Sequence, residues 1–525
     1  MMRKIVTVLL VFVAAVSMLF AGGGGQQSQG ASTGQAARIT VQVFDRGTDA
    51  GKSDPTNNEW TNWIKAKVLK DENIAVSFVP VPRWEEGNIL NTLMAAGTPP
   101  DVCISYSDTT NFRDQGGLVD LAPYINTLLG DLNKFLGPDP ALPGKDLIRR
   151  SEIPETGRVY TLPARRINRA NFNVWIRGDW LNKLGLGLPT TPEEYYNALK
   201  SFKERDPGGV GQNRVIPLIL GTTNLMWQIQ TMIDPFIDPS LSTKEFWINT
   251  VLDRHLLLPG FKEGVRFFNR LYNEGLIDQD FPLHRSESDL SNPIKAGLVG
   301  SYEDSWDGPY RESNAVLSDL QRNVPGANIV PIDPFTTTGR TYKAAYDAAG
   351  AFYFVPAVSK NPEAAVRYIN WLSKLENYSF LQIGPEGVTH DMVDGVPKLK
   401  AATGLWIQNS PQNIDYTLPM NGLELGNEEL NIRALASGYP WSEEIMRNAY
   451  NVAMHNARPD PVFSVALSAA GPVSQILSDK ANIILTDAIR CAPADFDRVW
   501  DAGIRDWLAS GAQTVIDERR AKYPN

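Results

Sequence analysis

The sequence predicts an α/β protein with more than one domain, and three observations lead to this class. Short β-branched runs alternate with amphipathic helical segments from residue 38 onward. The chain has 525 residues, which is long for a single domain. Hydrophobic residues make up 43% of it, enough to fill sizeable cores. Strands that alternate with helices imply mostly parallel sheets flanked by helices.

Residues 1–21 read as a secretory signal peptide. Arg3 and Lys4 precede an apolar run at 5–20, and the small residue Ala21 follows it. The run is shorter than the ~20 residues that span a bilayer. A lipid anchor would need a cysteine directly after the run, but Gly22 stands there. We therefore expect an exported, soluble and unlipidated protein, periplasmic or extracellular.

Residues 22–37 are polar, rich in glycine and without aromatic side chains, so we expect a disordered tether. Without Arg3 and Lys4, the 50 basic residues become 48 against 59 acidic ones, a net charge of −11. Such a surface repels nucleic acid and anionic membranes, which excludes both as partners.

The elements expected after the tether follow one another at short intervals. Cys103 falls in the fifth of them and is expected to be a buried thiol, whereas its pairing with Cys491 is left open. Thr191 and Asn361 each precede a proline and open helices further along. The first five elements are a strand at 39–44, a helix at 58–70, a strand at 75–81, a helix at 85–96 and a strand at 101–105.

The sequence lacks the motifs that several kinds of catalytic and metal-binding sites require. No Walker A pattern occurs, and no second histidine or cysteine stands at helical spacing from any histidine. A zinc site or a histidine-based triad is therefore not predicted. We expect the histidines on the surface or at helix ends: His255, His284, His390 and His455.

Tryptophans in polar loops are the unusual feature of the sequence. A sugar stacks its C–H face on an aromatic plane while its hydroxyls bond carboxylates, amides and guanidinium groups. Each tryptophan could instead plug its loop against the core, but four in similar settings favour a carbohydrate cleft. The four are Trp84, Trp227, Trp306 and Trp406.

Stretches in order over nearly the whole chain carry a family resemblance: "AAGTPPDV" at 95–102, "GRVYTLPARR" at 157–166, "IRGDWLNKLGLGLPTTPEEYYNALKSF" at 176–202, "GLVGSYEDSW" at 297–306, "SKNPEAAVRYINWLS" at 359–373 and "IGPEGVTH" at 383–390. Together with the amphipathic C-terminus they resemble the large extracellular solute-binding proteins of bacterial ABC-type carbohydrate importers, which are related to the alginate-binding and oligosaccharide-binding lipoproteins. The segment at 176–202 is the most specific.

The resemblance implies a two-lobed periplasmic-binding-protein fold of type II. Each lobe is a mostly parallel sheet flanked by helices, with hinge crossovers near Tyr160–Pro163 and Pro334–Tyr346 and a helical C-terminus. The implied N-terminal lobe comprises 38–162 and 343–390, and the implied C-terminal lobe comprises 163–342 and 391–525.

The function that the resemblance implies is that of a substrate-binding protein, a monomer without cofactor or enzymatic activity. It would capture an oligosaccharide, neutral or uronate-containing, and deliver it to the membrane permease of an ABC transporter. Arg165 and Arg166, with Arg169 nearby, fit a sugar carboxylate or a neutral sugar. The expected ligand-binding residues are Trp84, Tyr106, Arg165, Trp227, Asp304, Trp306, Tyr346 and Trp406.

Two other classes of function stay open. A secreted polysaccharide-active enzyme, such as a glycosidase, would use carboxylates from Glu303, Asp304 and Asp307, although three acids in one loop do not show the spacing across a bond that hydrolysis needs. An adhesin or scaffold protein fits the tether but leaves the loop tryptophans unexplained.

The stretch "ERDPGGVGQNR" at 204–214 corresponds to a loop that holds calcium in the alginate-binding branch. Asp206 remains, but Gly208 and Val210 replace two oxygen-bearing side chains, and Arg214 stands where an acid is common. Calcium takes 6–8 oxygen ligands, largely from carboxylates. We expect a structural linker without metal, with weak calcium binding as the alternative.

Overall fold

The computed structural model describes residues 34–46, 54–107, 109–142, 144–222, 225–312, 314–337, 342–400, 406, 416–463, 465 and 467–523. The expected signal peptide and most of the expected tether lie outside these ranges. Among the described residues, no helix is long and apolar enough to cross a membrane.

The first sheet contains the strands expected near the N-terminus. Its order is β2-β1-β3-β10-β4-β13, where a Val41–Val102 bridge joins β1 to β3 and β10 runs antiparallel to both neighbours. Cys103 is fully buried in β3, as predicted, and both cysteines are free thiols. The strands are β1 (Ala37–Asp45), β2 (Ile74–Pro82), β3 (Cys103–Ser105), β4 (Leu162–Arg166), β10 (Ala349–Phe354) and β13 (Pro419–Met420).

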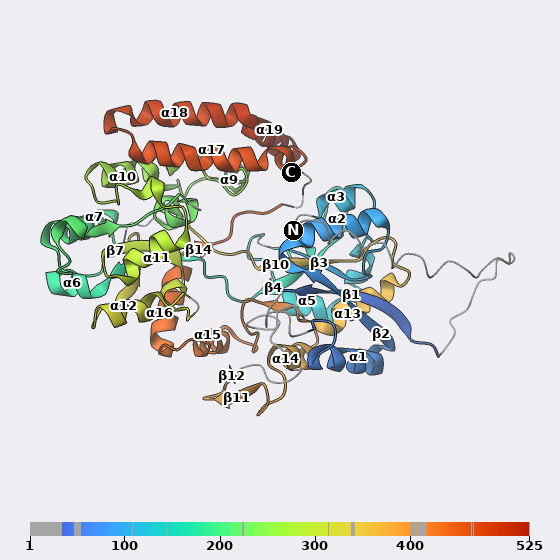
Figure 1. Cartoon of the computed structure of the whole chain (residues 1–525). Coiled ribbons are helices and arrows are strands. Elements are labelled where there is room, and N and C mark those ends of the chain that lie inside the picture. Colours follow the sequence, from blue (N-terminus) through green and yellow to red (C-terminus); the bar gives the residue numbers. More distant parts are fainter. Residues whose placement is uncertain are drawn as a thin grey trace, which may run out of the picture. The chain divides into compact units, whose positions relative to one another are not determined.

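Helices flank this sheet (Figure 1), and its core holds the rings of Trp60 and Trp371. Asn58 caps the first helix, and Gly97 ends the second in a left-handed conformation with φ 69°, as expected for a glycine stop. The helices are α1 (Glu59–Glu72), α2 (Glu86–Ala96), α3 (Thr110–Asp114), α4 (Ala122–Ile125), α5 (Gly130–Leu136), α13 (Pro362–Leu372) and α14 (Leu375–Ile383).

The second sheet has the order β6-β7-β5-β8, with β5 antiparallel to both of its neighbours. Since β6 and β7 are its one parallel pair, this sheet is mixed, and not mostly parallel as predicted for each lobe. Its strands are β5 (Phe172–Arg177), β6 (Ile216–Leu218), β7 (Val299–Ser305) and β8 (Ile329–Ile332). Thr191 caps α7 through the backbone N–H of Glu194, which confirms the helix start read from the sequence. The helices around the sheet are α6 (Gly178–Leu184), α7 (Pro192–Arg205), α8 (Gln230–Ile233), α9 (Thr243–Asn249), α10 (Phe261–Asn273), α11 (Glu287–Lys295), α12 (Val316–Asn323), α15 (Glu428–Ser437) and α16 (Glu443–Met454).

The C-terminus is helical, as expected. Helices α17 (Ala470–Arg490), α18 (Phe496–Trp507) and α19 (Gln513–Lys522) lie together, and α17 packs on α10 of the second sheet's core (Figure 1). Trp500 and Trp507 are buried in that core, where the indole N–H of Trp507 donates to the Leu477 carbonyl at 2.9 Å. The periodic apolar face of the sequence is therefore a core face.

Three segments carry the chain between the two sheets, and we call 167–171, 345–348 and 421–427 the crossing segments. They follow β4, β9 (Lys343–Ala344, paired with β14, Ala457–Arg458) and β13. The first segment begins later than the expected Tyr160–Pro163, because Arg165 and Arg166 still pair with β13. A short hairpin of β11 (His390–Val393) and β12 (Val396–Leu399) precedes the third segment.

Two histidines depart from the sequence expectation, since His390 is buried at the start of β11 and His255 belongs to a buried ionic group. His255 is fully buried rather than on the surface, with one ring nitrogen 3.0 Å from Asp234 and the other 3.0 Å from Asp460. Burial alone would lower the pKa of His255, but the two carboxylates outweigh it and raise that pKa well above its usual value. The spacing of histidines along the chain gave no signal of this arrangement, since its carboxylates are 21 and 205 residues away.

Candidate ligand-binding site at the crossing segments

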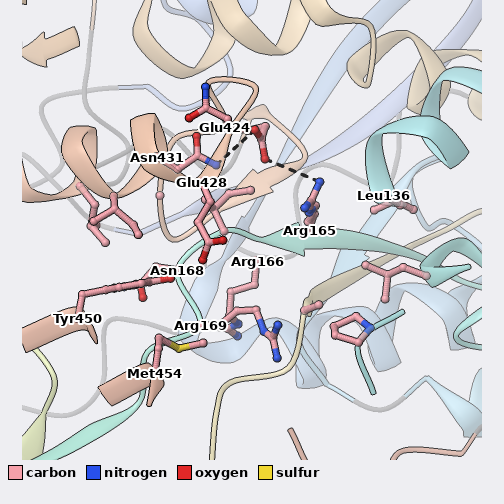
Figure 2. A pocket seen from close by; sticks show the side chains of 18 of the residues that line it. Leu136, Arg165, Arg166, Asn168, Arg169, Glu424, Glu428, Asn431, Tyr450 and Met454 are labelled. Carbon is pink, nitrogen blue, oxygen red and sulfur yellow. Dashed lines mark hydrogen bonds and ion pairs between the residues drawn. The ribbon is translucent and has the colours of Figure 1, made fainter. Parts of the chain in front are cut away.

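A cavity of about 370 Å³ lies against all three crossing segments (Figure 2). Residues from α15 and α16 close it together with residues around the end of α5. Its polar lining mixes guanidinium, carboxylate, amide and phenol groups. These are Arg165, Arg166, Asn168, Arg169, Glu424, Asn427, Glu428, Asn431 and Tyr450.

Arg165 is tied to the protein within this cavity. Its guanidinium donates to the Phe135 carbonyl at 2.9 Å and lies 3.7 Å from a carboxylate oxygen of Glu424. Glu424 in turn accepts from the amide of Asn431 at 3.3 Å and from a backbone N–H of its own turn (Figure 2). The predicted ligand residue Arg165 therefore links β4 to the third crossing segment.

The next residue, Arg166, behaves differently, since neighbouring side chains on a strand point to opposite faces. Its guanidinium lies over the ring of Tyr346, 4.9 Å from the centroid. The Nε atom is buried without a hydrogen-bond partner, and burial lowers the pKa of this guanidinium. Tyr346 itself is 39% exposed, so one predicted ring contact is open to solvent.

Arg169 and Tyr346 bind the first two crossing segments to each other. The backbone N–H of Tyr346 donates to the Arg169 carbonyl at 3.0 Å, and Arg169 Nε donates to the Tyr346 carbonyl at 3.2 Å. Burial lowers the pKa of the Arg169 guanidinium, which Asp347, Tyr450 and Glu428 oppose through space. Arg169 thus carries a partly desolvated charge at the edge of the cavity.

Tyr106, just after β3, is a second tyrosine whose ring is covered by an arginine, in this case Arg83. The guanidinium of Arg83 is 3.7 Å from the centroid of the Tyr106 ring, and Glu86 accepts from the Tyr106 N–H at 2.6 Å. Tyr106 also lines a second cavity of about 960 Å³, whose lining includes Val462, Phe463, Val465 and Leu467. The side chain of the predicted residue Trp84 lies outside the described part of the structure.

The corresponding end of the second sheet presents Trp227. Its side chain is 50% exposed, and its ring lies 6.2 Å from that of Phe172 at the start of β5. Phe172 pairs with Ser305, and Asp304 precedes Ser305 at the end of β7. Burial raises the pKa of Asp304 to about 6, although its carboxylate accepts from the Ser305 N–H at 2.7 Å. Two predicted residues therefore share this edge.

Two of the predicted tryptophans are packed into cores. Trp306 is 3% exposed and meets Tyr439 and Tyr450 edge-on at 5.9 and 5.6 Å. Trp406 is half-buried and lies 4.9 Å from the ring of Trp60. In this structure Trp306 has no free face on which a sugar could stack, which is the core alternative that the sequence left open.

Two of the three acids considered for hydrolysis, Glu303 and Asp307, are engaged in contacts within the protein. Glu303 is buried and accepts from the Thr231 N–H at 2.8 Å, and burial raises its pKa to about 8. Asp307 is paired with Arg311 at 2.6 Å and accepts from the Tyr439 hydroxyl. These contacts occupy the two carboxylates with groups of the protein itself.

The loop compared with a calcium site is closed by its own hydrogen bonds. Asp206 accepts from the N–H groups of Val210 at 3.0 Å and Gly211 at 2.8 Å, one on each carboxylate oxygen. Lys183 donates to the Pro207 carbonyl at 3.0 Å, which places a cation on an oxygen of the loop. Among the described residues, no cluster of three or more metal-ligating side chains occurs.

Sequence reasoning missed the residues that complete the cavity. Glu424, Glu428 and Tyr450 come from segments more than 250 residues after Arg165, as the numbering shows. The sequence predicts Arg166 only as part of an arginine group that fits a sugar, and not among the individual ligand-binding residues. Strand alternation could have distinguished the two, had the bounds of β4 been known.

A family model described as "Bacterial extracellular solute-binding protein" matches residues 54–378, and the chain belongs to this family. Three curated relatives have informative names. Lipoprotein LipO of Bacillus subtilis is 25% identical, and the alignment covers 86% of each chain. The fructooligosaccharide ABC transporter substrate-binding protein FusA of Streptococcus pneumoniae is 26% identical over 36% of this chain and 37% of its own. The polygalacturonan/rhamnogalacturonan-binding protein YtcQ of Bacillus subtilis is 23% identical over 50% of this chain and 53% of its own.

Solved structures share the fold at low identity. An extracellular solute-binding protein from Bifidobacterium longum subsp. infantis matches with a TM-score of 0.63 and 16% identity, covering 93% of this chain and 97% of that one. The alginate-binding protein AlgQ2 matches with a TM-score of 0.52 and 18% identity, covering 94% and 98%. These likenesses confirm the predicted α/β, two-lobed solute-binding-protein fold.

Proposed function

We propose that this chain is the substrate-binding protein of an ABC importer and captures an oligosaccharide between its lobes for delivery to the membrane permease. Membership in the extracellular solute-binding family supports the binding role. The names of FusA and YtcQ, which describe a fructooligosaccharide and two pectic polysaccharides, support a saccharide as ligand.

The observation that carries the saccharide proposal concerns exposed aromatic rings. Within the described part of the chain, Trp227 and Tyr346 are the exposed aromatic side chains, and all others are buried or half-buried. An aromatic ring that is exposed to solvent does not contribute the free energy of burial that such a side chain normally adds to the stability of a core. Stacking on the C–H face of a sugar recovers it, so both rings fit the role of platforms.

Each lobe would then supply part of the site. Trp227 and Asp304 offer a ring and a hydroxyl acceptor from the second sheet, and Tyr346 and Tyr106 offer rings on the side of the first. A ligand that touches both sets favours the closed arrangement, because only that arrangement makes all the contacts. Arg165, held by Glu424, would act as a link between the lobes rather than as a direct contact.

Binding without turnover, monomeric behaviour and secretion without a lipid belong to the same proposal. Gly22 after the apolar run supports secretion without a lipid, and the intact mass of the exported protein tests this point. Incubation with mixed oligosaccharides followed by a reducing-end assay tests the enzyme alternative. New reducing ends would identify a hydrolase instead.

A thermal-shift screen across fructo-, xylo- and galacturono-oligosaccharides tests the main proposal. A ligand at 100 times its Kd adds about 2.7 kcal/mol to the free energy of unfolding. We expect at least one saccharide class to raise Tm, with calorimetry then giving one site per chain. A complete absence of shifts at millimolar saccharide would reject the proposal.

A further inference from the structure

The cavity at the crossing segments contains two guanidinium groups without a carboxylate partner. Within the described part of the chain, neither Arg166 nor Arg169 forms an ion pair, and Arg166 Nε is buried without a hydrogen bond. Burial lowers the pKa of both guanidinium groups. A charge that is partly removed from water costs free energy until an opposite charge meets it.

Two other buried arginines of this chain show one way in which that cost is offset, whereas Arg254 and Arg519, like Arg166, have a buried Nε without a hydrogen-bond partner. Arg150 lies between the carboxylates of Asp139 and Asp347, and Arg177 is paired with Asp179 at 2.7 Å. Arg166 and Arg169 instead lie in the lining of a cavity large enough for a ligand group. The geometry therefore leaves two directed guanidinium groups available to an incoming anion.

The remaining lining limits which anion fits. Asp347 and Glu428 both act on Arg169 through space, and Asp347 also acts on Arg166, so these carboxylates repel a multiply charged ion such as phosphate. Glu424 and Glu428 are acceptors that hydroxyl groups can satisfy, and Asn168 adds an amide to them. A ligand group with one carboxylate and several hydroxyls matches this combination, whereas a neutral sugar leaves both arginines without a directly bonded carboxylate.

We propose that this cavity recognises the carboxylate of a uronic acid unit and that Arg166 and Arg169 bind this carboxylate. The transported saccharide would then be acidic. This inference rests on the proposed function and narrows its substrate class. The cavity of about 370 Å³ is at the lower end of small-molecule sites, which span roughly 300–1,000 Å³, and suits one sugar unit of a chain. The sugar hydroxyls would bond Glu424 and Glu428.

Calorimetry with two matched ligands tests the inference. The probes are a trimer of galacturonic acid and the same trimer with its carboxyl groups methyl-esterified, which removes the charge and keeps the hydroxyls. Hydrogen bonds to charged groups contribute about 1.5–3 kcal/mol. We therefore expect the acid to bind roughly 10- to 150-fold more tightly than the ester.

Two variants and a control assign that preference to the cavity. Arg169→Gln and Arg166→Gln should each reduce the preference of acid over ester at least severalfold. Arg322→Gln, an exposed arginine on α12, should keep it. Melting temperatures without ligand check folding, and Arg169→Lys, which keeps the charge but not the planar fork, should retain part of the preference.

The outcomes separate this inference from the proposed function. Equal affinity for acid and ester, or binding of neutral oligosaccharides alone, overturns the inference and leaves an oligosaccharide-binding protein. If both glutamine variants still prefer the acid over the ester, the inference is also overturned, because the carboxylate then binds at another site. Sulfate at millimolar concentration serves as a competitor. If sulfate displaces the trimer and binds as tightly as the trimer does, the cavity is a simple anion site and the inference is overturned. Binding of no saccharide rejects the proposed function itself.

Discussion

The guanidinium of Arg166 lies over the ring of Tyr346, with its central carbon 4.9 Å from the ring centroid. Arg166 is the last residue of β4, and Tyr346 belongs to the second crossing segment. The pair therefore joins the edge of the first sheet to a strand connection that leads to the second. Such a contact contributes about 0.5–1 kcal/mol at a partly exposed site.

Replacing Tyr346 tests whether its ring serves a ligand. We expect Tyr346→Ala to weaken saccharide binding by about 1 kcal/mol, roughly fivefold, because one stacking face is lost. Melting temperature should change little, since the ring is 39% exposed. Tyr346→Phe keeps the ring and should bind like the parent. Unaltered affinity of the alanine variant in calorimetry would argue against a platform.

Trp227 is the stronger candidate, because its side chain is 50% exposed and larger. Trp227→Ala should cost about 1–3 kcal/mol of binding, or roughly 5- to 150-fold in affinity. Leu283 serves as the control, since it is apolar and 68% exposed. Leu283→Ala should alter neither affinity nor Tm. If both variants bind equally well, Trp227 has no role in the site.

The sequence predicted the architecture well because its signals are local. Thr191, Gly97 and the β-branched run of β1 mark element ends and faces through their own backbone chemistry. Trp227 and Trp306 look alike in sequence, since both stand in polar loops. Only the second meets partners 133 and 144 residues away, Tyr439 and Tyr450, and these decide that it is buried.

The same limit applies to charged residues. Whether Arg165 or Arg166 faces a ligand depends on which face of β4 meets Glu424, a residue more than 250 positions later. The burial of His255 could not be predicted either, since the two carboxylates that contact it come from distant segments. Long-range pairing therefore sets the site, while local signals set the elements.

Glu303 should make stability depend on pH. Burial raises its folded pKa to about 8 from an ordinary 4.5, so the folded state holds a proton that the unfolded state has lost between these values. The free energy of unfolding therefore falls as pH rises from 4.5 to 8. His255, whose folded pKa is raised above 6.5, adds a fall of the same sign above pH 6.5.

Glu303→Gln removes the first of these contributions and keeps an acceptor for the Thr231 N–H. We expect it to match the parent near pH 4 and to exceed it by about 2–4 kcal/mol at pH 8, measured by chemical denaturation. Glu204→Gln, a change at an exposed site on α7, should leave the pH profile unaltered. A parallel profile for Glu303→Gln and the parent would show that Glu303 is ionised in the folded protein.

Calcium removal should have no effect on this chain. Both carboxylate oxygens of Asp206 already accept backbone N–H groups, and Lys183 holds a loop carbonyl. Chelator treatment should thus change neither Tm nor saccharide affinity. Titration of calcium into chelated protein should give no heat beyond dilution. A stoichiometric micromolar isotherm would instead establish a calcium site that rearranges this loop.

Replacement of Trp306 gives the clearest distinction between a ring that supports the fold and a ring that stacks on the ligand. Because it is 3% exposed and held edge-on by Tyr439 and Tyr450, Trp306→Ala should lose about 3–5 kcal/mol of folding free energy. The folded fraction, assayed well below the lowered Tm, should still bind saccharide within about twofold of the parent, since the ring touches no solvent-facing surface. Trp306→Phe fills more of the space and should recover part of the lost stability. Chemical denaturation measures the first effect without ligand, and calorimetry on folded protein measures the second. A Trp306→Ala protein of parental stability with weakened binding would reverse the assignment, because only a ring that reaches the ligand could produce that combination.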